Sequence, residues 1–192
     1  MLEIPVTDNE RQLVSHCLAD DPVALQAFVE QFQGMVFSLC FRMLGHRQDA
    51  EDVTQIVFLR ALRNLHTWDS SRPLKPWLFT IAANRCRTHL VNRTRQPRIG
   101  LANEPPAPID GAPGNLALAE ELQLALMQLP EQYRLCFVLH HQQELNLQTI
   151  SEILDCPLGT IKTWLYRARR ELADILERRG LAPQVNHELP RI

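Results

Sequence analysis

The segment that decides the fold runs from residue 158 to residue 170 and reads LGTIKTWLYRARR. From its fourth residue onward, small or apolar side chains recur at spacings of four and three, which is the pattern of one buried stripe on an amphipathic helix. They are Ile161, Leu165, Ala168, Leu172 and Ile175. The same spacing turns most basic and hydroxyl side chains to the opposite face. The segment therefore predicts a helix with a buried stripe and a cationic surface.

A shorter apolar segment, residues 147–154, lies upstream of the break at residues 155–157. A helix, a tight break and a basic helix are typical of a helix-turn-helix, whose second helix enters the DNA major groove. We expect Asn146 to cap the first helix, Asp155 to adopt left-handed geometry, and Gly159 to allow a close backbone approach. The alternative is a surface helix with a solvated cationic face.

The 192-residue chain carries a formal net charge of −2, but its charges are segregated. Residues 60–98 contain nine Lys/Arg and one acid, and residues 162–179 contain six Lys/Arg and three acids. Two basic zones on a nearly neutral chain favour two contacts with a polyanion. No apolar run approaches the ~20 residues that span a bilayer. The N-terminus lacks a signal-peptide pattern, so we expect a cytoplasmic protein without direct membrane insertion.

The five cysteines lie far apart, without a Cys-x-x-Cys pair, and we interpret them as reduced, buried side chains. His140 and His141 beside Cys136 are the nearest approach to a metal cluster, but further ligands at suitable spacing are missing. The chain also lacks a glycine-rich phosphate loop and a nucleophile-elbow motif. The sequence therefore predicts no metal, no cofactor and no enzymatic activity.

Nearly every periodic segment is helical, so we expect an all-α protein. Thr7 and Glu10 form a plausible capping box for the first helix. Besides the helix-turn-helix, we expect helices over residues 22–44, 48–65, 74–95, 116–129 and 130–143. Residues 96–115 contain five Pro and three Gly and predict a flexible linker. The expected organisation is a domain at 8–95, the linker at 96–115, a second domain at 116–179 and a tail at 180–192.

The expected helix over residues 48–65 has a broad core face on a helical wheel. Its opposite face carries two aliphatic side chains among charged ones and consists of Asp49, Asp52, Gln55, Ile56, Leu59, Arg60 and Arg63. Aliphatic residues on an outward face indicate a protein-binding patch. The alternative is that they are isolated exposed residues, which are common on soluble proteins.

The expected helix over residues 74–95 mixes arginine, an aromatic ring and hydrogen-bonding side chains on one side, with Trp77, Thr80, Asn84, Arg87, Thr88 and Val91. Such a face suits single-stranded DNA, whose unstacked bases expose their edges and ring faces. The preceding loop, residues 66–75, adds Trp68 and Arg72. The alternative for Trp77 is a place in the core.

Three motifs together resemble the bacterial sigma factors of the extracytoplasmic-function (ECF) group, in which domains two and four are joined by a linker. They are DAEDVTQIVF at residues 49–58, PWLFTIAANR at 76–85 and CPLGTIKT followed by RAR over 156–169. The resemblance covers roughly residues 8–178. It implies a four-helix domain two, a helix-turn-helix domain four, and a non-enzymatic subunit that directs core RNA polymerase to promoters. That subunit recognises −35 and −10 elements and traps melted non-template bases.

The resemblance also implies three sets of site residues. Core polymerase is expected to contact Asp49, Asp52, Gln55, Ile56, Leu59 and Arg63. The single-stranded −10 element is expected to contact Trp68, Arg72, Trp77, Thr80, Asn84, Arg85, Arg87 and Thr88. The double-stranded −35 element is expected to contact Thr160, Lys162, Thr163, Tyr166, Arg167 and Arg170. A dedicated anti-sigma factor is a further implied partner, and it could hold the protein at the membrane.

Two departures from the family pattern concern these sets. Ile56 stands where glutamate is usual in the polymerase-binding motif. Trp164 stands where arginine is frequent, so the base preference at −35 is the least transferable part of the resemblance.

Two other classes of protein also remain open. A stand-alone transcription regulator would share the helix-turn-helix but needs no polymerase-docking face, and an enzyme would need catalytic motifs that the chain lacks.

Overall fold

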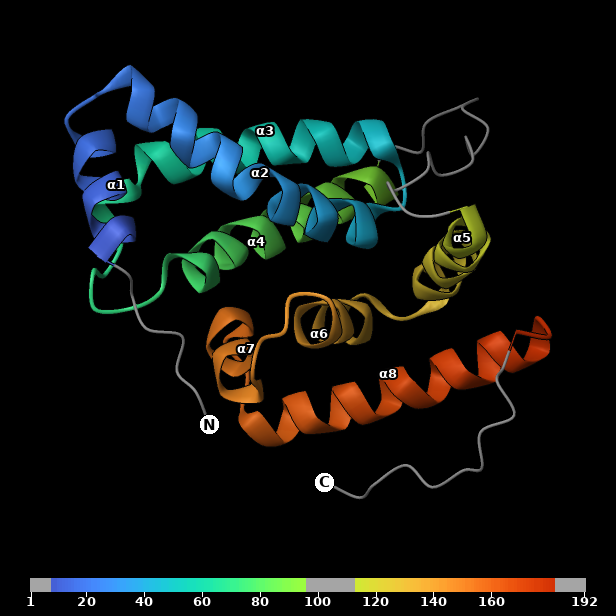
Figure 1. Ribbon diagram of the computed structural model, residues 1–192. Helices are drawn as coiled ribbons and strands as arrows, with labels where there is room; N and C mark the ends of the chain where they lie inside the picture. Colours follow the sequence, from blue (N-terminus) through green and yellow to red (C-terminus); the bar gives the residue numbers. More distant parts are fainter. Residues whose placement is uncertain (1–7, 96–112, 182–192) are drawn as a thin grey trace.

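The computed structural model describes residues 8–95 and 113–181, and every regular element within these ranges is helical (Figure 1). The helices are α1 (Asp8–Leu18), α2 (Pro22–Leu44), α3 (Arg47–Arg63), the 3-10 helix η1 (Leu65–Thr67), α4 (Leu74–Arg95), α5 (Pro113–Gln128), α6 (Glu131–His141), α7 (Leu147–Leu154) and α8 (Leu158–Arg178). The prediction of an all-α fold is confirmed. Thr7, residues 96–112 and residues 182–192 lie outside the described ranges, and α5 begins within the segment that was predicted as linker.

Helix α2 begins and ends as its sequence predicts. The Asp21 side chain accepts a hydrogen bond from the Val23 N–H at 3.0 Å, and Pro22 occupies the first turn. At the other end, Gly45 adopts φ = 70° and donates its N–H to the Phe41 carbonyl at 2.8 Å. Glycine is favoured there because it adopts positive φ without the steric strain that a side chain causes.

Helices α1 to α4 form the N-terminal unit. Helix α2 packs against α1, α3 and α4, and α3 also packs against α4. The core of this unit contains fully buried large side chains, including Phe28, Leu39, Met43, Leu65 and Phe79. The apolar face expected on α3 is buried as well, which leaves its opposite face for other contacts.

Helices α5 to α8 form the C-terminal unit, in which α6 and α7 pack against α8. Asn146 caps α7 by accepting the Thr149 N–H at 2.8 Å, and Asp155 adopts φ = 50° at the turn, as predicted. The apolar stripe of α8 is buried, also as predicted. The expectation for Gly159 is wrong: a Cβ added there would meet no atom within 4 Å, since this residue lies in the open first turn of α8.

The two units pack directly against each other. Helix α2 contacts α5 and α6, and α4 contacts α7. Two polar side chains are buried where the units meet: Arg42 is 9% exposed and Gln123 is 2% exposed. The sequence indicated two tethered modules but not this contact between them.

Candidate polymerase and DNA interfaces

The outward face of α3 presents an apolar patch within a polar surround. Ile56 is 43% exposed and Leu59 is 57% exposed, while Asp52, Gln55 and Arg63 are exposed around them. An apolar centre with a polar rim is the usual composition of a protein–protein interface. The structure therefore brings together five of the six residues expected to bind polymerase, and we call this set the α3 face.

Asp49 is the exception, and its predicted outward position is wrong. Its side chain is buried, and its Oδ2 lies 3.4 Å from His89 Nε2 and 3.7 Å from Arg93 Nη1, both on α4. His46 Nδ1, at the start of α3, lies 3.9 Å from the same oxygen. Asp49 therefore ties the first turn of α3 to the C-terminal half of α4 and is covered by both.

The outward side of α4 is a mixed surface. Asn84 and Thr88 are exposed, and the Thr88 hydroxyl donates to the Asn84 carbonyl at 2.8 Å. Thr80 is half-buried and donates to the Pro76 carbonyl at 3.1 Å. Trp77 is half-buried and packs against the core, as the alternative interpretation of this residue allowed. We call Trp77, Thr80, Asn84 and Thr88 the α4 face.

Arg85 lies half-buried, away from the most exposed part of this helix. Burial lowers the pKa of its guanidinium, and the charge of Arg60 on α3 lowers this pKa further. Arg85 therefore sits on the side of α4 that approaches α3, at the edge of the surface expected to bind the −10 element.

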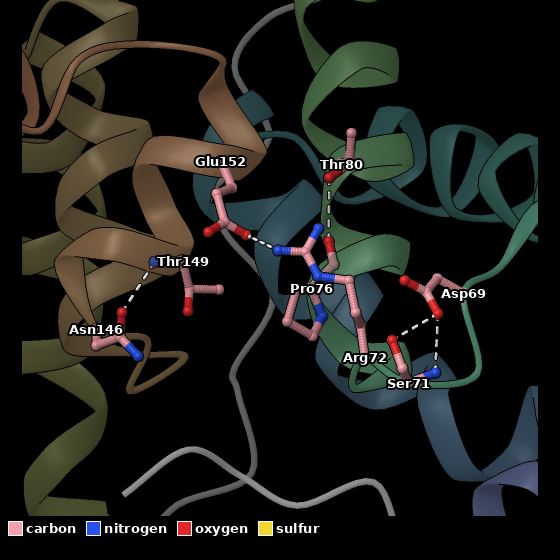
Figure 2. A network of polar contacts seen from close by, with 8 residues as sticks. All are labelled: Asp69, Ser71, Arg72, Pro76, Thr80, Asn146, Thr149 and Glu152. Atoms are coloured by element: carbon pink, nitrogen blue, oxygen red, sulfur yellow. Dashed lines mark hydrogen bonds and ion pairs between the residues drawn. The ribbon is translucent and has the colours of Figure 1, made fainter. Parts of the chain in front are cut away.

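The loop before α4 is held in shape by its own side chains (Figure 2). Asp69 Oδ1 accepts hydrogen bonds from the Ser71 N–H at 2.9 Å and the Ser71 hydroxyl at 2.7 Å. Trp68 is 9% exposed, and its indole N–H donates to the Arg72 carbonyl at 3.0 Å. The ring of Trp68 is thus part of the core and not available for stacking on a base, which corrects the sequence prediction. Its position fixes the loop instead.

Three cations of the first basic zone point toward the C-terminal unit. Arg72 forms an ion pair with Glu152 of α7 (Figure 2), and Arg87 Nε lies 3.5 Å from Glu131 Oε1 of α6. Lys75 donates to the Gln143 carbonyl at 3.0 Å. Burial lowers the pKa of Lys75, and the charge of Glu144 opposes that shift. Arg72 and Arg87, both expected to bind DNA, are therefore occupied within the chain.

The polar side of α8 is open in comparison. Its exposed side chains include Lys162, Thr163, Tyr166, Arg167 and Arg170, whereas Thr160 is half-buried. The Thr163 hydroxyl donates to the Gly159 carbonyl at 2.9 Å, which holds its side chain against the helix. The structure thus brings together the residues expected to contact the −35 element along one helix, and we call them the α8 face.

Helix α6 supports the arginines of α8 through two contacts that sequence inspection missed. Arg167 Nη1 donates to the Tyr133 hydroxyl oxygen at 2.9 Å, a contact that raises the pKa of Arg167. Arg169 Nε donates to His141 Nε2 at 3.1 Å. Tyr133 and His141 precede these arginines by 34 and 28 residues, so no local pattern in the sequence links them.

Comparisons with known protein families match both units. Residues 28–96 match Sigma-70 region 2, and residues 119–172 match Sigma-70, region 4. The chain is 33% identical over 167 residues to the ECF RNA polymerase sigma factor SigW of Bacillus subtilis, covering 79% of this chain and 88% of that protein. It is 30% identical over 184 residues to the ECF RNA polymerase sigma-E factor of Escherichia coli K12, covering 85% and 92%.

The chain belongs to the ECF sigma factors of RNA polymerase. This ECF sigma factor is a non-enzymatic initiation factor that directs RNA polymerase to promoters, with region 2 acting at −10 and region 4 at −35. Its fold is similar to the sigma factor RpoE of Bartonella quintana, solved with the anti-sigma factor NepR, with a TM-score of 0.69 and 24% identity over 79% of this chain and 96% of that one.

A second solved structure of similar fold is CnrH in complex with the cytosolic domain of CnrY. It gives a TM-score of 0.66 and 23% identity over 89% of this sigma factor and 99% of that chain. Among the described helices of this sigma factor, none combines the length and apolarity required to cross a membrane.

Proposed function

We propose that the three faces divide the work of this sigma factor. The α3 face docks on core polymerase, the α4 face holds melted non-template bases of the −10 element, and the α8 face binds the −35 element in the major groove. The observation that carries the proposal is the α8 face, since Lys162, Thr163 and Arg167 are exposed on early turns while the apolar stripe is buried. Recognition helices of helix-turn-helix proteins use these turns for base edges.

The same geometry supports different roles for the residues of the α8 face, some contacting bases and others the DNA backbone. Arg167 has a planar guanidinium held by Tyr133, which suits a hydrogen bond to a base edge. Arg170 lies about one turn further along, where side chains of a helix entering the groove reach phosphates. Lys162 and Thr163 add donors near the start of the helix. We assign base contact to Arg167 and backbone contact to Arg170.

The α4 face supports the single-stranded assignment. Asn84 and Thr88 offer donors and acceptors to unpaired base edges, and the partly exposed Trp77 ring lies about two turns before Asn84. Extruding a base from a duplex costs a few kcal/mol of stacking, so a preformed surface with nearby cations is needed. The loop around Trp68 is held in one conformation, which supplies part of a preformed surface and reduces the conformational entropy lost on binding.

The similarity to known sigma factors supports two further parts of the proposal, a protein partner and a cellular location. The solved structures of similar fold include one sigma factor in complex with an anti-sigma factor, and we assign a comparable protein partner to this chain. To initiate transcription, a sigma factor must be in the same compartment as RNA polymerase and DNA. We therefore assign this sigma factor to the cytoplasm.

The experiment that tests the proposal is reconstitution with purified core polymerase. We expect the chain to co-elute with the core enzyme and to start transcription at one position of a matching promoter. Reactivity of unpaired thymines at −10 toward permanganate should appear only with the complete holoenzyme. Co-elution without unpaired bases would contradict the α4 assignment, and loss of both would contradict the α3 assignment.

A further inference from the structure

One aromatic side chain of α8 is not yet accounted for. Trp164 is half-buried, and its ring packs against the hydrophobic core. It lies about one turn after Thr160 and about one turn before Arg167, which are both expected at the −35 element. Tryptophan has an apolar ring and one polar atom, so the ring can pack inside a protein while the N–H meets a partner outside. The position of Trp164 at the border of the core fits this use.

The indole N–H of Trp164 has no hydrogen-bond acceptor within residues 8–95 and 113–181. Its nitrogen is also not among the atoms that these ranges bury without a partner, so it is open to solvent. Trp68 is the contrasting case, because its N–H donates to the Arg72 carbonyl at 3.0 Å. Trp164 therefore presents a donor, on a ring held by packing, that the described parts of the chain leave available.

The direction of Trp164 follows from the helical period. At ~100° per residue, Trp164 lies about 60° around α8 from the centre of the buried stripe, and Arg167 lies about 60° further in the same direction. Lys162, Tyr166 and Arg170 occupy the remaining outward side. Trp164 is thus at the edge of α8 where the buried stripe meets the α8 face.

The edge of a helix in the major groove faces the DNA backbone. An α-helix with its side chains is about 10–12 Å across, and the major groove of B-form DNA is about 12 Å wide, so the helix fills the groove. Residues at the centre of its outward side then approach base edges, while residues at its edges approach the sugar–phosphate walls. Phosphate oxygens are the most frequent acceptors for protein donors in such complexes. A phosphate is therefore the acceptor that suits a donor at this edge.

Resting on the proposed role of the α8 face, we propose that Trp164 donates its indole N–H to a phosphate oxygen of the −35 DNA. This contact comes from a neutral group. A cation that neutralises a phosphate releases a counterion and makes binding depend on salt, whereas a neutral donor does not. Trp164 therefore contributes affinity that salt does not remove. It contributes equally on every base sequence, because phosphates carry no sequence information directly.

The test uses the full-length chain and a duplex that contains the −35 element, with fluorescence anisotropy at several salt concentrations. Trp164→Phe keeps an aromatic ring against the core and removes the N–H. It should weaken binding about tenfold, as expected for one hydrogen bond to a charged group, equally on the matched duplex and on single-base variants. The salt dependence should stay that of the wild type. Circular dichroism and the thermal midpoint verify that the fold is retained.

A charged replacement at the same position gives a second readout. Trp164→Arg places a cation beside the same phosphate, so the slope of log K against log[salt] should become steeper by about 0.9. The matched control is Leu176→Arg, at another half-buried apolar residue of α8 that packs against the core. Leu176 lies about 18 Å further along the helix, more than a Debye length of ~8 Å, so this variant should keep the wild-type slope.

Ethylation interference identifies the individual phosphates on which binding depends. One phosphate of the −35 element should interfere when ethylated in the wild type and not in Trp164→Phe, while the other positions stay the same. A tryptophan that acts only through packing would change the whole pattern or none of it.

Wild-type affinity of Trp164→Phe, an unchanged salt slope for Trp164→Arg or an unchanged ethylation pattern would each overturn the phosphate contact. A loss confined to the matched sequence would also overturn it, because that result assigns Trp164 to a base. In these cases, preference of the wild type for the −35 duplex shows that the proposed role of the α8 face stands. If the wild type does not prefer this duplex over an unrelated one, that role fails and the phosphate contact fails with it.

Discussion

The two helices proposed to bind DNA, α4 and α8, differ in how far the rest of the chain contacts the residues on and beside their polar faces. The polar side of α8 is open, and its neighbour α6 holds Arg167 in place. The polar side of α4 is flanked by cations that are already paired with the C-terminal unit. The helix proposed to read duplex DNA thus has an open polar face, whereas residues beside the helix proposed to hold unpaired bases already have partners within the chain. The surface proposed for −35 binding is therefore accessible in this structure, whereas cations beside the surface proposed for −10 binding contact the C-terminal unit.

The largest effect is expected from a variant that loses polymerase docking while α4 and α8 remain unchanged. Asp52→Arg reverses a charge on the α3 face and should weaken binding to core polymerase by roughly 100-fold or more, as like charges in an interface cost several kcal/mol. Gel filtration with the core enzyme measures the loss. Binding of the free chain to a −35 duplex should be unchanged. Glu30→Arg on α2 is the control, and equal binding by both variants would show that the α3 face is not the docking site.

The next prediction concerns the α8 face alone. Arg167→Ala should cost about 1–3 kcal/mol of −35 affinity and relax the preference at one base pair, because it removes a base-edge contact. Arg170→Ala should weaken binding equally on all sequences and reduce the salt dependence, as expected for a phosphate contact. Anisotropy titrations on the −35 duplex and on single-base variants measure both. If both variants lost the same affinity on every sequence and showed the same salt dependence, the assignment of base contact to Arg167 and phosphate contact to Arg170 would be wrong.

Tyr133→Phe tests whether α6 supports DNA binding by the α8 face. Loss of the hydroxyl removes the acceptor that holds Arg167, and we expect about 0.5–1.5 kcal/mol of −35 affinity to be lost. In a double-mutant cycle, Tyr133→Phe should have almost no effect once Arg167 is alanine, since the two side chains then no longer interact. Additive losses would show that Tyr133 acts through packing and not through Arg167.

The smallest expected effect is a dependence of stability on pH. Partial burial lowers the pKa of His141 to about 4, and the charge of Arg169 lowers it as well. The unfolded chain, with an ordinary pKa of about 6.5, binds the proton more readily, so this residue reduces stability as pH falls from about 6.5 to about 4. The thermal midpoint of His141→Gln should therefore fall less than that of the wild type across this range. His16→Gln, an exposed change on α1, should follow the wild type.

The sequence predicted the local features of this fold because they depend on neighbouring residues. The bounds of α2, the cap at Asn146, the left-handed Asp155 and the stripe of α8 all follow from residue types at short spacing. The same holds for most of the α3 face. These features are set by helix periodicity and backbone preference, which are present before any tertiary contact forms.

The missed features depend on contacts between distant segments. A helical wheel placed Asp49 on the outward face because it could not show that His89 and Arg93 of α4 lie against this side chain. Trp68 was expected near DNA, yet the carbonyl of Arg72 accepts its N–H and the ring joins the core. Arg42 and Gln123 are separated by 81 residues, so no local pattern predicts their pairing.

The buried carboxylate of Asp49 has one more consequence. It ties the start of α3 to the far end of α4 through ion pairs with His89 and Arg93. The surface proposed to recruit polymerase and the surface proposed to hold unpaired bases are thereby fixed relative to each other by one buried side chain.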